Sequence, residues 1–334
     1  MKAMVLEEIA SIDTAPLRWR ELPDPEPGAG EVRLQVHCCG VCRTDLHVVE
    51  GDLPRAKLPI IPGHQIVGVV DKVGADCTQI EVGQRVGVAW LRYTCGQCTF
   101  CRRGRENLCE SSRFTGYHAD GGYAEYAVVP EAFAYSMPDG FDDLHAAPLL
   151  CSGIIGYRAL KRACVPEGGT LALYGFGSSA HVIFQIAKHR GYEVFVVSRG
   201  GKHLELAKDM GADWAGSNPA DMPGKADGAI IFAPVGHLVL PALEALQKGG
   251  ALALAGIYMT DIPQLDYEKH VFYERDIHSV TANTREDGRG LLAEAAEVPI
   301  RPHVTTYPIE EANRALQDLK ADRINGTGVL VVRR

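Results

Sequence analysis

The sequence predicts an α/β protein with two domains, a β-rich domain followed by a doubly wound parallel sheet. Its 334 residues, 46% of them hydrophobic, suffice for two cores at about 150 residues per domain. Short β-like runs separated by Gly and Pro fill roughly the first 150 residues, whereas apolar runs alternate with helical stretches from about residue 170 onward. The change in rhythm marks the domain boundary.

The individual elements follow from these patterns. In the β-rich part, strands are predicted at residues 31–36, 66–73 and 85–89. The alternating part predicts strands at 170–174, 193–197, 228–233 and 251–255, with helices at 180–189 and 204–210. A helical stretch at 309–319 and a closing strand at 328–332 depart from that alternation. We expect this last segment to return to the first domain.

Charge and composition restrict the class of function. The formal net charge is -8, the pI is near 5.8, and no basic block occurs, which argues against nucleic-acid and anionic-membrane surfaces. No secretory pattern and no run of about 18 apolar residues is present, so we expect a cytoplasmic enzyme. In that compartment the ten cysteines favour metal or catalytic roles over disulfides.

Four cysteines are closely spaced in the segment CGQCTFCRRGRENLC. Cys95, Cys98, Cys101 and Cys109 form a C-x2-C-x2-C-x7-C pattern, which predicts a structural zinc site closed by four protein ligands. An iron–sulfur cluster is the alternative, but the Pro that follows the fourth Cys in bacterial ferredoxins is replaced by Glu110.

Three dispersed residues are candidates for a second metal site. Cys42, His64 and Cys151 together would form a catalytic zinc site with one position left open for water or substrate. Near Cys42, Thr44 and His47 are candidates for passing a hydroxyl proton outward, and Asp45 for orienting a metal ligand. A turn or a helix cap is the structural alternative for Thr44 and Asp45.

A glycine-rich turn predicts a dinucleotide site. Gly175, Gly177 and Ala180 form G-x-G-x-x-A directly after an apolar strand and at the start of a helix, as in a Rossmann fold. At the end of the next strand, Ser198 and Arg199 stand where NAD enzymes carry an acid. This pair favours NADP, whose 2'-phosphate Arg199 would bind, with NAD as the alternative.

Over essentially its whole length the sequence resembles the zinc-dependent medium-chain alcohol dehydrogenase family, in particular bacterial alcohol dehydrogenases and cinnamyl-alcohol-dehydrogenase-like enzymes. The resemblance rests on GVCRTDLH at 40–47, PGH at 62–64, the four-cysteine segment, DGGYAEY at 120–126, Cys151 and the glycine turn. It implies a GroES-like catalytic domain (residues 1–151), a Rossmann cofactor-binding domain (152–284) and a C-terminal segment (285–334) that returns to the first.

Residue roles carry over from the resemblance. Cys42, His64 and Cys151 match the catalytic zinc ligands, the four clustered cysteines match the structural ones, Thr44 and His47 match the proton relay, and Asp45 matches the residue that orients a ligand. Arg43 matches a pyrophosphate contact and Trp90 a substrate-pocket position. The chain departs from the family at Gln65, where Glu is usual, at Ile155, where Thr is common, and at Ser198, where the acid is missing.

The resemblance thus implies two zinc ions per subunit, a nicotinamide cofactor, and reversible hydride transfer to and from a primary or secondary alcohol. It also implies a small-molecule alcohol or aldehyde substrate, no nucleic-acid or membrane partner, and a homodimer or homotetramer. Two alternatives stay open. One is a polyol, threonine or formaldehyde dehydrogenase of the same superfamily, and the other is a non-catalytic zinc- and dinucleotide-binding sensor, which Gln65 and Ile155 would support.

Overall fold

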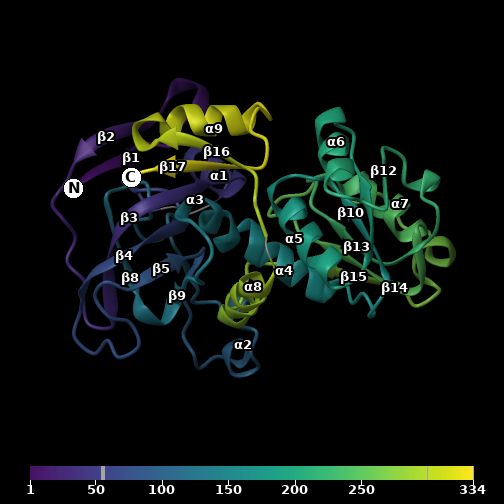
Figure 1. Cartoon of the computed structure of the whole chain (residues 1–334), viewed down its shortest axis with the longest axis horizontal. Helices are drawn as coiled ribbons and strands as arrows, with labels where there is room; N and C mark the ends of the chain where they lie inside the picture. Colours follow the sequence, from purple (N-terminus) through teal and green to yellow (C-terminus); the bar gives the residue numbers. More distant parts are fainter. Residues whose placement is uncertain (54–56, 299, 334) are drawn as a thin grey trace. The chain divides into compact units, whose positions relative to one another are not determined.

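The chain divides into two compact units (Figure 1). The computed structural model describes residues 1–53, 57–298 and 300–333. Unit 1 comprises Met1–Cys151, Ala282–Ala296 and Arg301–Arg334, and unit 2 comprises Ser152–Thr281 and Glu297–Ile300. Residues 282–284, which we expected in the cofactor domain, lie in unit 1. The reason is local, because the backbone N–H and the hydroxyl of Thr284 donate to Asp287 at 3.0 and 2.8 Å and so tie this stretch to helix α8 (Arg285–Glu297).

Unit 2 is built on a six-stranded, fully parallel sheet. Its strands are β10 (Thr170–Tyr174), β11 (Glu193–Val197), β12 (Trp214–Gly216), β13 (Ala226–Ile231), β14 (Leu246–Leu254) and β15 (Asp276–Ser279). The order β12-β11-β10-β13-β14-β15 reads 3-2-1-4-5-6, which is that of a Rossmann fold. The predicted doubly wound sheet is confirmed.

In unit 2, helices and helical turns alternate with these strands along the chain. They are α4 (Ser152–Arg162), α5 (Ser178–His189), α6 (Gly201–Asp209) and α7 (Val239–Glu244), with 3-10 turns at Pro219–Asp221 and Gly236–Leu238 and a π-helical turn at Tyr267–Val271. The central strands read as continuous apolar runs because they are buried on both faces. Strands β12 and β15 were not predicted, because they are short and half-exposed and carry no apolar run.

Unit 1 is β-rich, as predicted. Its main sheet has the order β16-β17-β3-β4-β5-β9, and β8 pairs with β3. The strands of this sheet are β3 (Glu31–Val41), β4 (Gln65–Val73), β5 (Arg85–Val88), β8 (Tyr126–Pro130), β9 (Ala134–Ser136), β16 (Val304–Pro308) and β17 (Thr327–Val331). Unit 1 also contains two two-stranded sheets. One pairs β1 (Lys2–Leu6) with β2 (Leu17–Glu21), and the other pairs β6 (Leu91–Tyr93) with β7 (Arg113–Phe114). Through β17 the end of the chain pairs antiparallel with β3, so the C-terminal segment completes the first sheet.

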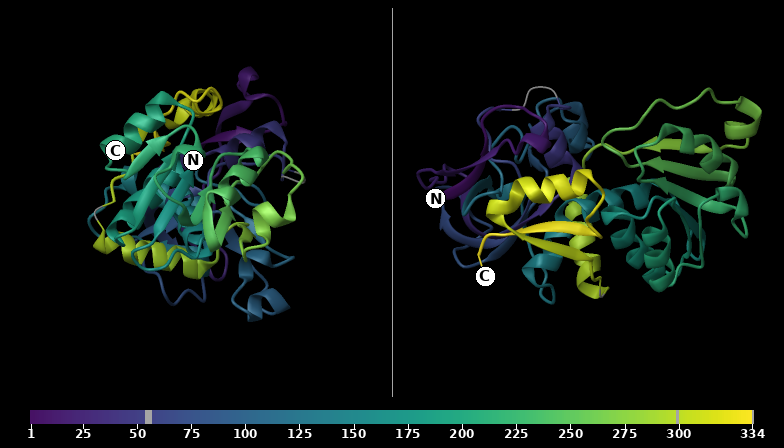
Figure 2. Two further views of the ribbon diagram at one scale, coloured as in Figure 1. Left: turned by 90° about the vertical axis from the view of Figure 1, so that its right-hand side faces the viewer. Right: turned by 90° about the horizontal axis from the view of Figure 1, so that it is seen from above.

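Short helices complete unit 1. They are α1 (Arg43–Glu50), α2 (Thr99–Arg102), α3 (Asp143–Ala146) and α9 (Ala312–Lys320), with 3-10 turns at Ile12–Thr14, Glu106–Leu108, Glu131–Phe133, Ala147–Leu150 and Ile309–Glu311. Helix α9 packs on β16, β17 and α1. The right-hand view of Figure 2 shows this yellow helix alongside the two yellow strands near the end of the chain. The core of the unit joins side chains of β1, β3, β4 and α9.

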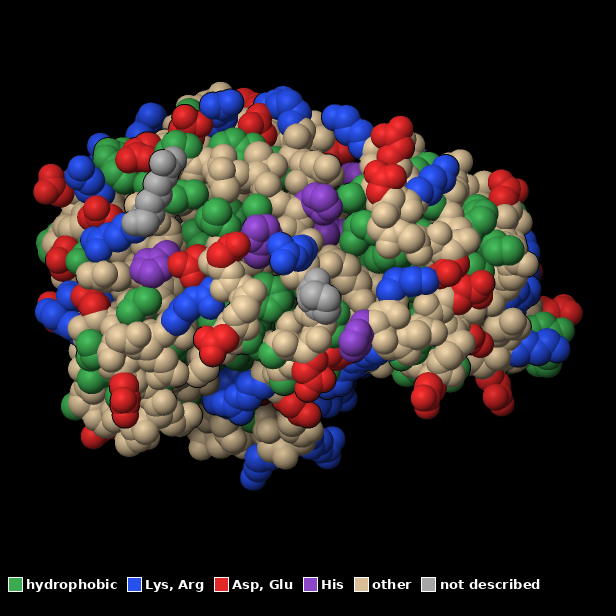
Figure 3. Space-filling model, viewed as in Figure 1, with side chains coloured by type: hydrophobic (Ala, Val, Ile, Leu, Met, Phe, Trp, Pro, Cys, Tyr) green, Lys and Arg blue, Asp and Glu red, His purple; other side chains and the backbone are tan. Residues whose placement is uncertain are grey.

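The surface agrees with the composition. On the face shown in Figure 3, acidic and basic side chains are interspersed, and no extended basic area is visible. Among the described residues, no helix has the length and hydropathy that a membrane span requires.

Candidate metal centres and dinucleotide loop

Cys42 is fixed by the start of a helix. It is the N-cap of α1, where its Sγ accepts a hydrogen bond from the backbone N–H of Thr44 at 3.3 Å. The backbone N–H of Cys42 donates in turn to Oδ2 of Asp45 at 2.9 Å, which completes a capping box. The cap that we considered as an alternative role for Asp45 is therefore present, and it places the thiol and the carboxylate side by side.

His64 is fixed by close backbone packing at the start of β4. The preceding Gly63 has φ +97°, and a Cβ there would lie 2.4 Å from the ring of Tyr123 and 2.9 Å from Sγ of Cys39. Only glycine fits this position. The carbonyl of Gly63 also accepts a hydrogen bond from the N–H of Gly122 at 2.9 Å, so the DGGYAEY segment holds the backbone next to His64.

The structure brings the three dispersed candidates together. Sγ of Cys42 lies 3.4 Å from Nε2 of His64 and 3.9 Å from Sγ of Cys151, and all three ligand atoms lie within 4.8 Å of one another. Cys151 follows the 3-10 turn Ala147–Leu150, which is fully buried. All three belong to unit 1.

This spacing fits a tetrahedral zinc ion. With Zn–S near 2.3 Å and Zn–N near 2.0 to 2.1 Å, tetrahedral angles give S···S of about 3.8 Å and S···N of about 3.6 Å. The separations between the three side chains are close to both values. Two thiols and one imidazole leave one coordination position without a protein ligand, which is the composition of a catalytic rather than a structural zinc site.

The charges and pKa values of these side chains also favour the binding of a cation. The hydrogen bond with Cys151 and then burial raise the pKa of the Cys42 thiol well above its ordinary range. Burial lowers the pKa of His64, but the charge of Asp45, the interaction with Cys42 and the hydrogen bonds with both outweigh it and raise this pKa to about 10. Without a metal ion the group therefore retains protons, which metal binding displaces.

Asp45 sets the orientation of His64. Its Oδ1 lies 3.0 Å from Nδ1 of His64, and both side chains are buried. An imidazole that donates from Nδ1 to a carboxylate presents Nε2 for metal binding. The geometry agrees with the role expected for Asp45.

Thr44 and His47 lie three residues apart on α1, a spacing that puts both side chains on one helix face. Thr44 is buried beside Cys42, whereas His47 is partly exposed and its Nδ1 lies 2.7 Å from Oδ2 of Asp52. Thr44 therefore lies next to the candidate zinc ligand Cys42, and His47 lies nearer to solvent. Arg43, the first residue of the same helix, is exposed.

Trp90 lies beside the candidate zinc ligand His64. Its ring meets the imidazole of His64 edge-on with a centroid separation of 4.9 Å. It also stacks on Phe114 at 4.9 Å and lies 5.8 Å from Tyr117, whose ring contacts His118. Of these aromatic residues only Trp90 was predicted from the sequence, although the stretch FTGYH at 114–118 contains the others.

Two buried polar side chains near the candidate zinc ligands lack hydrogen-bond partners. Gln65 is fully buried and packs on Gly40, and neither its Oε1 nor its Nε2 has a partner. The hydroxyl of Tyr123 is likewise buried without a partner, and burial followed by the charge of Asp45 raises its pKa well above the ordinary value. The role of Tyr123 was not foreseen, although the motif that contains it was.

The four clustered cysteines also converge. Sγ of Cys95 lies 4.0 Å from Sγ of Cys101, and all four sulfur atoms lie within 4.8 Å of one another. Backbone N–H groups point at the sulfurs, with Cys98 donating to Cys95 at 3.3 Å and Cys95 donating to Cys109 at 3.4 Å. Hydrogen bonds from Gln97 and Cys98 lower the pKa of Cys95 to about 6, which favours a thiolate. Four thiols in this arrangement fit zinc and leave no position for a substrate.

An ion pair that was not predicted from the sequence links this segment to α8. Oε2 of Glu106, between the third and fourth cysteine, lies 2.7 Å from Nη2 of Arg285, and its Oε1 accepts from the backbone N–H of Arg285 at 2.7 Å. The two residues are 179 positions apart, so nothing in the local sequence pointed to the contact.

The dinucleotide candidates lie together in unit 2. Gly175 follows β10 with φ +91°, Gly177 is the N-cap of α5, and Ala180 is fully buried in the first turn of that helix. A Cβ at Gly177 would meet nothing within 4 Å, so the backbone there is open to a phosphate. At the end of β11, Ser198 is buried and Arg199 is exposed.

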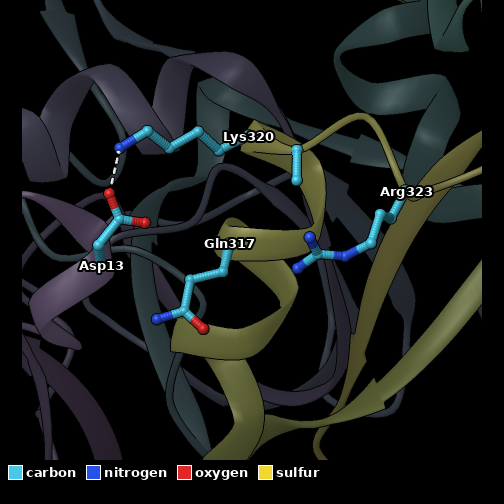
Figure 4. Close-up of a pocket in the computed structure, with 5 residues that line it drawn as sticks. Asp13, Gln317, Lys320 and Arg323 are labelled. Carbon is cyan, nitrogen blue, oxygen red and sulfur yellow. Dashed lines mark hydrogen bonds and ion pairs between the residues drawn. The ribbon is translucent and has the colours of Figure 1, made fainter.

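A separate hollow of about 350 Å³ lies in unit 1 between the turn Ile12–Thr14 and α9 (Figure 4). It is lined by Asp13, Gln317, Lys320, Ala321 and Arg323. Nζ of Lys320 lies 2.8 Å from Asp13, and Arg323 pairs with Asp318 at 2.6 Å. Its charges are thus already neutralised, and we assign it no function.

Comparison with known proteins gives consistent matches over the whole chain. Residues 28–139 match the family described as "Alcohol dehydrogenase GroES-like domain", and residues 180–297 match "Zinc-binding dehydrogenase". The chain is 51% identical to the probable alcohol dehydrogenase AdhA of Mycobacterium tuberculosis, covering 99% of this chain and 97% of that protein. It is 36% identical to an alcohol dehydrogenase of Geobacillus stearothermophilus, covering 99% and 100%. Among solved structures, AibC superposes with a TM-score of 0.91 at 30% identity, covering 99% and 95%.

Proposed function

Because the chain belongs to the zinc-binding medium-chain alcohol dehydrogenases, we propose that it transfers hydride reversibly between a primary or secondary alcohol and NADP, with one zinc ion at Cys42, His64 and Cys151. The observation that carries the proposal is the convergence of these three side chains at zinc-like spacing. A second zinc ion is assigned to Cys95, Cys98, Cys101 and Cys109.

Each residue near the proposed zinc ion has its own role in the proposed reaction. Zinc bound by the three side chains would supply a positive charge that makes an alcohol hydroxyl more acidic and polarises a carbonyl. Asp45 keeps Nε2 of His64 turned toward the centre. Thr44 takes up the hydroxyl proton as it leaves and passes it to His47, which releases it to solvent. Oxidation of one alcohol thus yields one carbonyl compound, one reduced nicotinamide and one proton.

Trp90 is assigned to the wall of the substrate site. Its edge-on contact with His64 places an aromatic surface next to the metal ligands. Apolar surface there favours substrates with a hydrocarbon or aromatic substituent over charged ones. Arg43 is assigned to the cofactor pyrophosphate on the family resemblance and its exposed position at the start of α1.

The preference for NADP is proposed from the end of β11. No carboxylate follows this strand, and Ser198 and Arg199 are followed by Lys202 and His203 in the first turn of α6. A guanidinium and a hydroxyl suit a 2'-phosphate, whereas a ribose 2'-hydroxyl is usually bound by an acid. Gly175, Gly177 and Ala180 would hold the pyrophosphate with either cofactor.

The test is absorbance of reduced nicotinamide with zinc-loaded protein over a panel of alcohols and aldehydes. We expect turnover with NADP(H), and Arg199→Ala should raise KM for NADP about 10- to 100-fold while leaving KM for NAD unchanged, since one charge-assisted contact is lost. Lys225→Ala, which removes an exposed basic side chain elsewhere in unit 2, should change neither. Turnover with NAD alone would contradict the NADP assignment but not the reaction.

A second candidate function is a non-catalytic sensor that binds zinc and dinucleotide. The neutral Gln65 beside His64 is the observation that favours it. Zinc-loaded protein that binds NADP yet turns over no member of the panel, including polyols, threonine and hydroxymethyl-glutathione adducts, would establish this alternative. We also propose a homo-oligomeric assembly.

A further inference from the structure

Tyr123 is a buried tyrosine near the candidate zinc ligands, and the proposed reaction gives it no role. Its side chain is fully buried, and its hydroxyl has no hydrogen-bond partner among the described residues. A buried hydroxyl without a partner destabilises a folded protein. Phenylalanine would fill the same space without this cost, so the presence of the hydroxyl itself requires an explanation.

Backbone hydrogen bonds fix Tyr123 beside the segment that carries His64. The N–H of Tyr123 donates to the carbonyl of Pro62 at 3.0 Å, and the N–H of Gly122 donates to the carbonyl of Gly63 at 2.9 Å. A Cβ on Gly63 would lie 2.7 Å from Cε1 of Tyr123, so the ring packs directly on the residue before His64. The direction of the hydroxyl is therefore set by the packing of the ring.

The groups around this hydroxyl belong to the proposed zinc centre or adjoin it. Burial raises the pKa of Tyr123 well above its ordinary value, and the charge of Asp45 and the neighbouring thiols of Cys39 and Cys42 raise it further. Part of the rise in pKa comes from an interaction of the hydroxyl with the Asp45 carboxylate itself, although the two groups do not reach hydrogen-bond geometry. The hydroxyl therefore keeps its proton and is available as a donor.

The Asp45 carboxylate is the strongest acceptor among these neighbours. A thiol is a weak acceptor, and Sγ of Cys42 already accepts from the N–H of Thr44. The carboxylate of Asp45 is buried, and it accepts from the backbone N–H of Cys42 at 2.9 Å and lies 3.0 Å from Nδ1 of His64. Because a carboxylate has about four acceptor positions, Asp45 can take a further donor.

Zinc binding would make that further donor more important. A zinc ion held by two thiolates and a neutral imidazole has no net charge, so the Asp45 carboxylate adds one negative charge on buried atoms. A buried charge is costly unless it is hydrogen-bonded. A hydroxyl donor would stabilise this charge and fix the orientation of the carboxylate that in turn orients His64.

We propose that Tyr123 is a positioning residue of the zinc centre, whose hydroxyl donates to the Asp45 carboxylate and thereby holds His64 in its zinc-binding orientation. The inference rests on the proposed function, because it requires zinc at Cys42, His64 and Cys151. Tyr123 acts through Asp45 and is not itself a zinc ligand.

The test is the zinc affinity of the Tyr123→Phe protein, measured by chelator competition on the full chain. The variant keeps the ring that packs on Gly63, and we expect the affinity of the three-residue centre to fall about threefold to tenfold. Tyr174→Phe is the matched control and should leave this affinity unchanged. Tyr174 is also fully buried and its hydroxyl also lacks a partner among the described residues, but it lies in unit 2.

Cobalt in place of zinc gives a readout that a purely structural role would not change. The absorption bands of Co²⁺ at the three-residue centre report the geometry of its ligands. We expect these bands to shift in Tyr123→Phe and to stay unchanged in Tyr174→Phe. Equal zinc affinity and equal cobalt spectra in the native and Tyr123→Phe proteins would overturn the proposal.

A double variant tests whether Tyr123 acts through Asp45. Tyr123→Phe/Asp45→Asn should bind zinc about as tightly as Asp45→Asn alone, because the charge that the hydroxyl stabilises is already absent. A further loss of affinity in the double variant would overturn the proposal. Zinc affinity can be measured whether or not the chain oxidises alcohols, so failure of this inference is distinguishable from failure of the proposed reaction. A native protein that binds zinc only at the four cysteines would overturn both.

Discussion

Oδ1 of Asp45 lies 3.0 Å from Nδ1 of His64, and the same carboxylate caps the helix that begins after Cys42. One buried side chain therefore positions two proposed zinc ligands, one from the helix and one from the sheet. The carboxylate also provides the negative charge that sustains the raised pKa of His64.

Replacing Asp45 by Asn should weaken this metal centre without dismantling the fold. The amide keeps the size of the side chain but loses the charge that orients His64, and we expect zinc affinity of the centre to fall about 10- to 100-fold. Chelator competition measures the loss. Asp52→Asn is the control, because Asp52 contacts His47 rather than a ligand; equal affinity in both variants would show that Asp45 does not position the metal.

The Glu106–Arg285 pair should make stability depend on pH. Burial favours the protonated acid, but the hydrogen bonds and charge of Arg285 outweigh it and hold the pKa of Glu106 below 4.5. A lowered folded-state pKa adds stability above pH 4.5 that is lost as the pH falls through the folded value. Glu106→Gln should therefore cost about 1 to 3 kcal/mol at pH 7 and progressively less in acid.

Thermal unfolding of the native and Glu106→Gln proteins from pH 7 to pH 3.5 measures this difference. Glu311→Gln serves as the control, since its partner Arg314 is 66% exposed and such a pair contributes at most about 1 kcal/mol. A difference between native and Glu106→Gln that is independent of pH would show that the ion pair is not its source.

Gln65→Met should stabilise the protein. Both amide atoms of Gln65 are buried without partners, and such a group costs about 1 to 3 kcal/mol, whereas Met has a similar length and no such requirement. Chemical denaturation of both proteins with zinc bound gives the free energy of unfolding. A destabilised Gln65→Met protein would mean that the amide is engaged in the zinc-loaded state.

Much of the fold was predictable because unit 2 repeats one local pattern. Strands such as β10 and β11 are continuous apolar runs at the predicted positions, since burial on both faces dictates their composition. Strands β12 and β15 were missed for the opposite reason, as both are short and half-exposed. Pairing of β17 with β3 joins residues almost 300 positions apart. The break in the strand–helix alternation predicted that the last segment returns to the first domain, but it did not indicate which strand it would join.

For the candidate sites, residues whose identity is dictated by chemistry could be proposed from sequence, and the structure groups them in space. Thiols and imidazoles at metal-ligand spacing and glycines at a tight turn are such residues. Residues whose role depends on contacts between distant parts of the chain were not recognised. These are Tyr123, which packs on Gly63, Phe114, which stacks on Trp90, and Arg285, which forms an ion pair with Glu106. The chain makes such contacts only when it is folded.

The most direct test of the account is zinc content together with turnover in two single variants. The native chain should carry two zinc ions and be active. Cys42→Ala should retain one zinc ion and a native circular dichroism spectrum but lose turnover, whereas Cys98→Ala should lose the other zinc ion and thermal stability. An active Cys42→Ala protein, or one that still binds two zinc ions, would contradict the proposed catalytic centre.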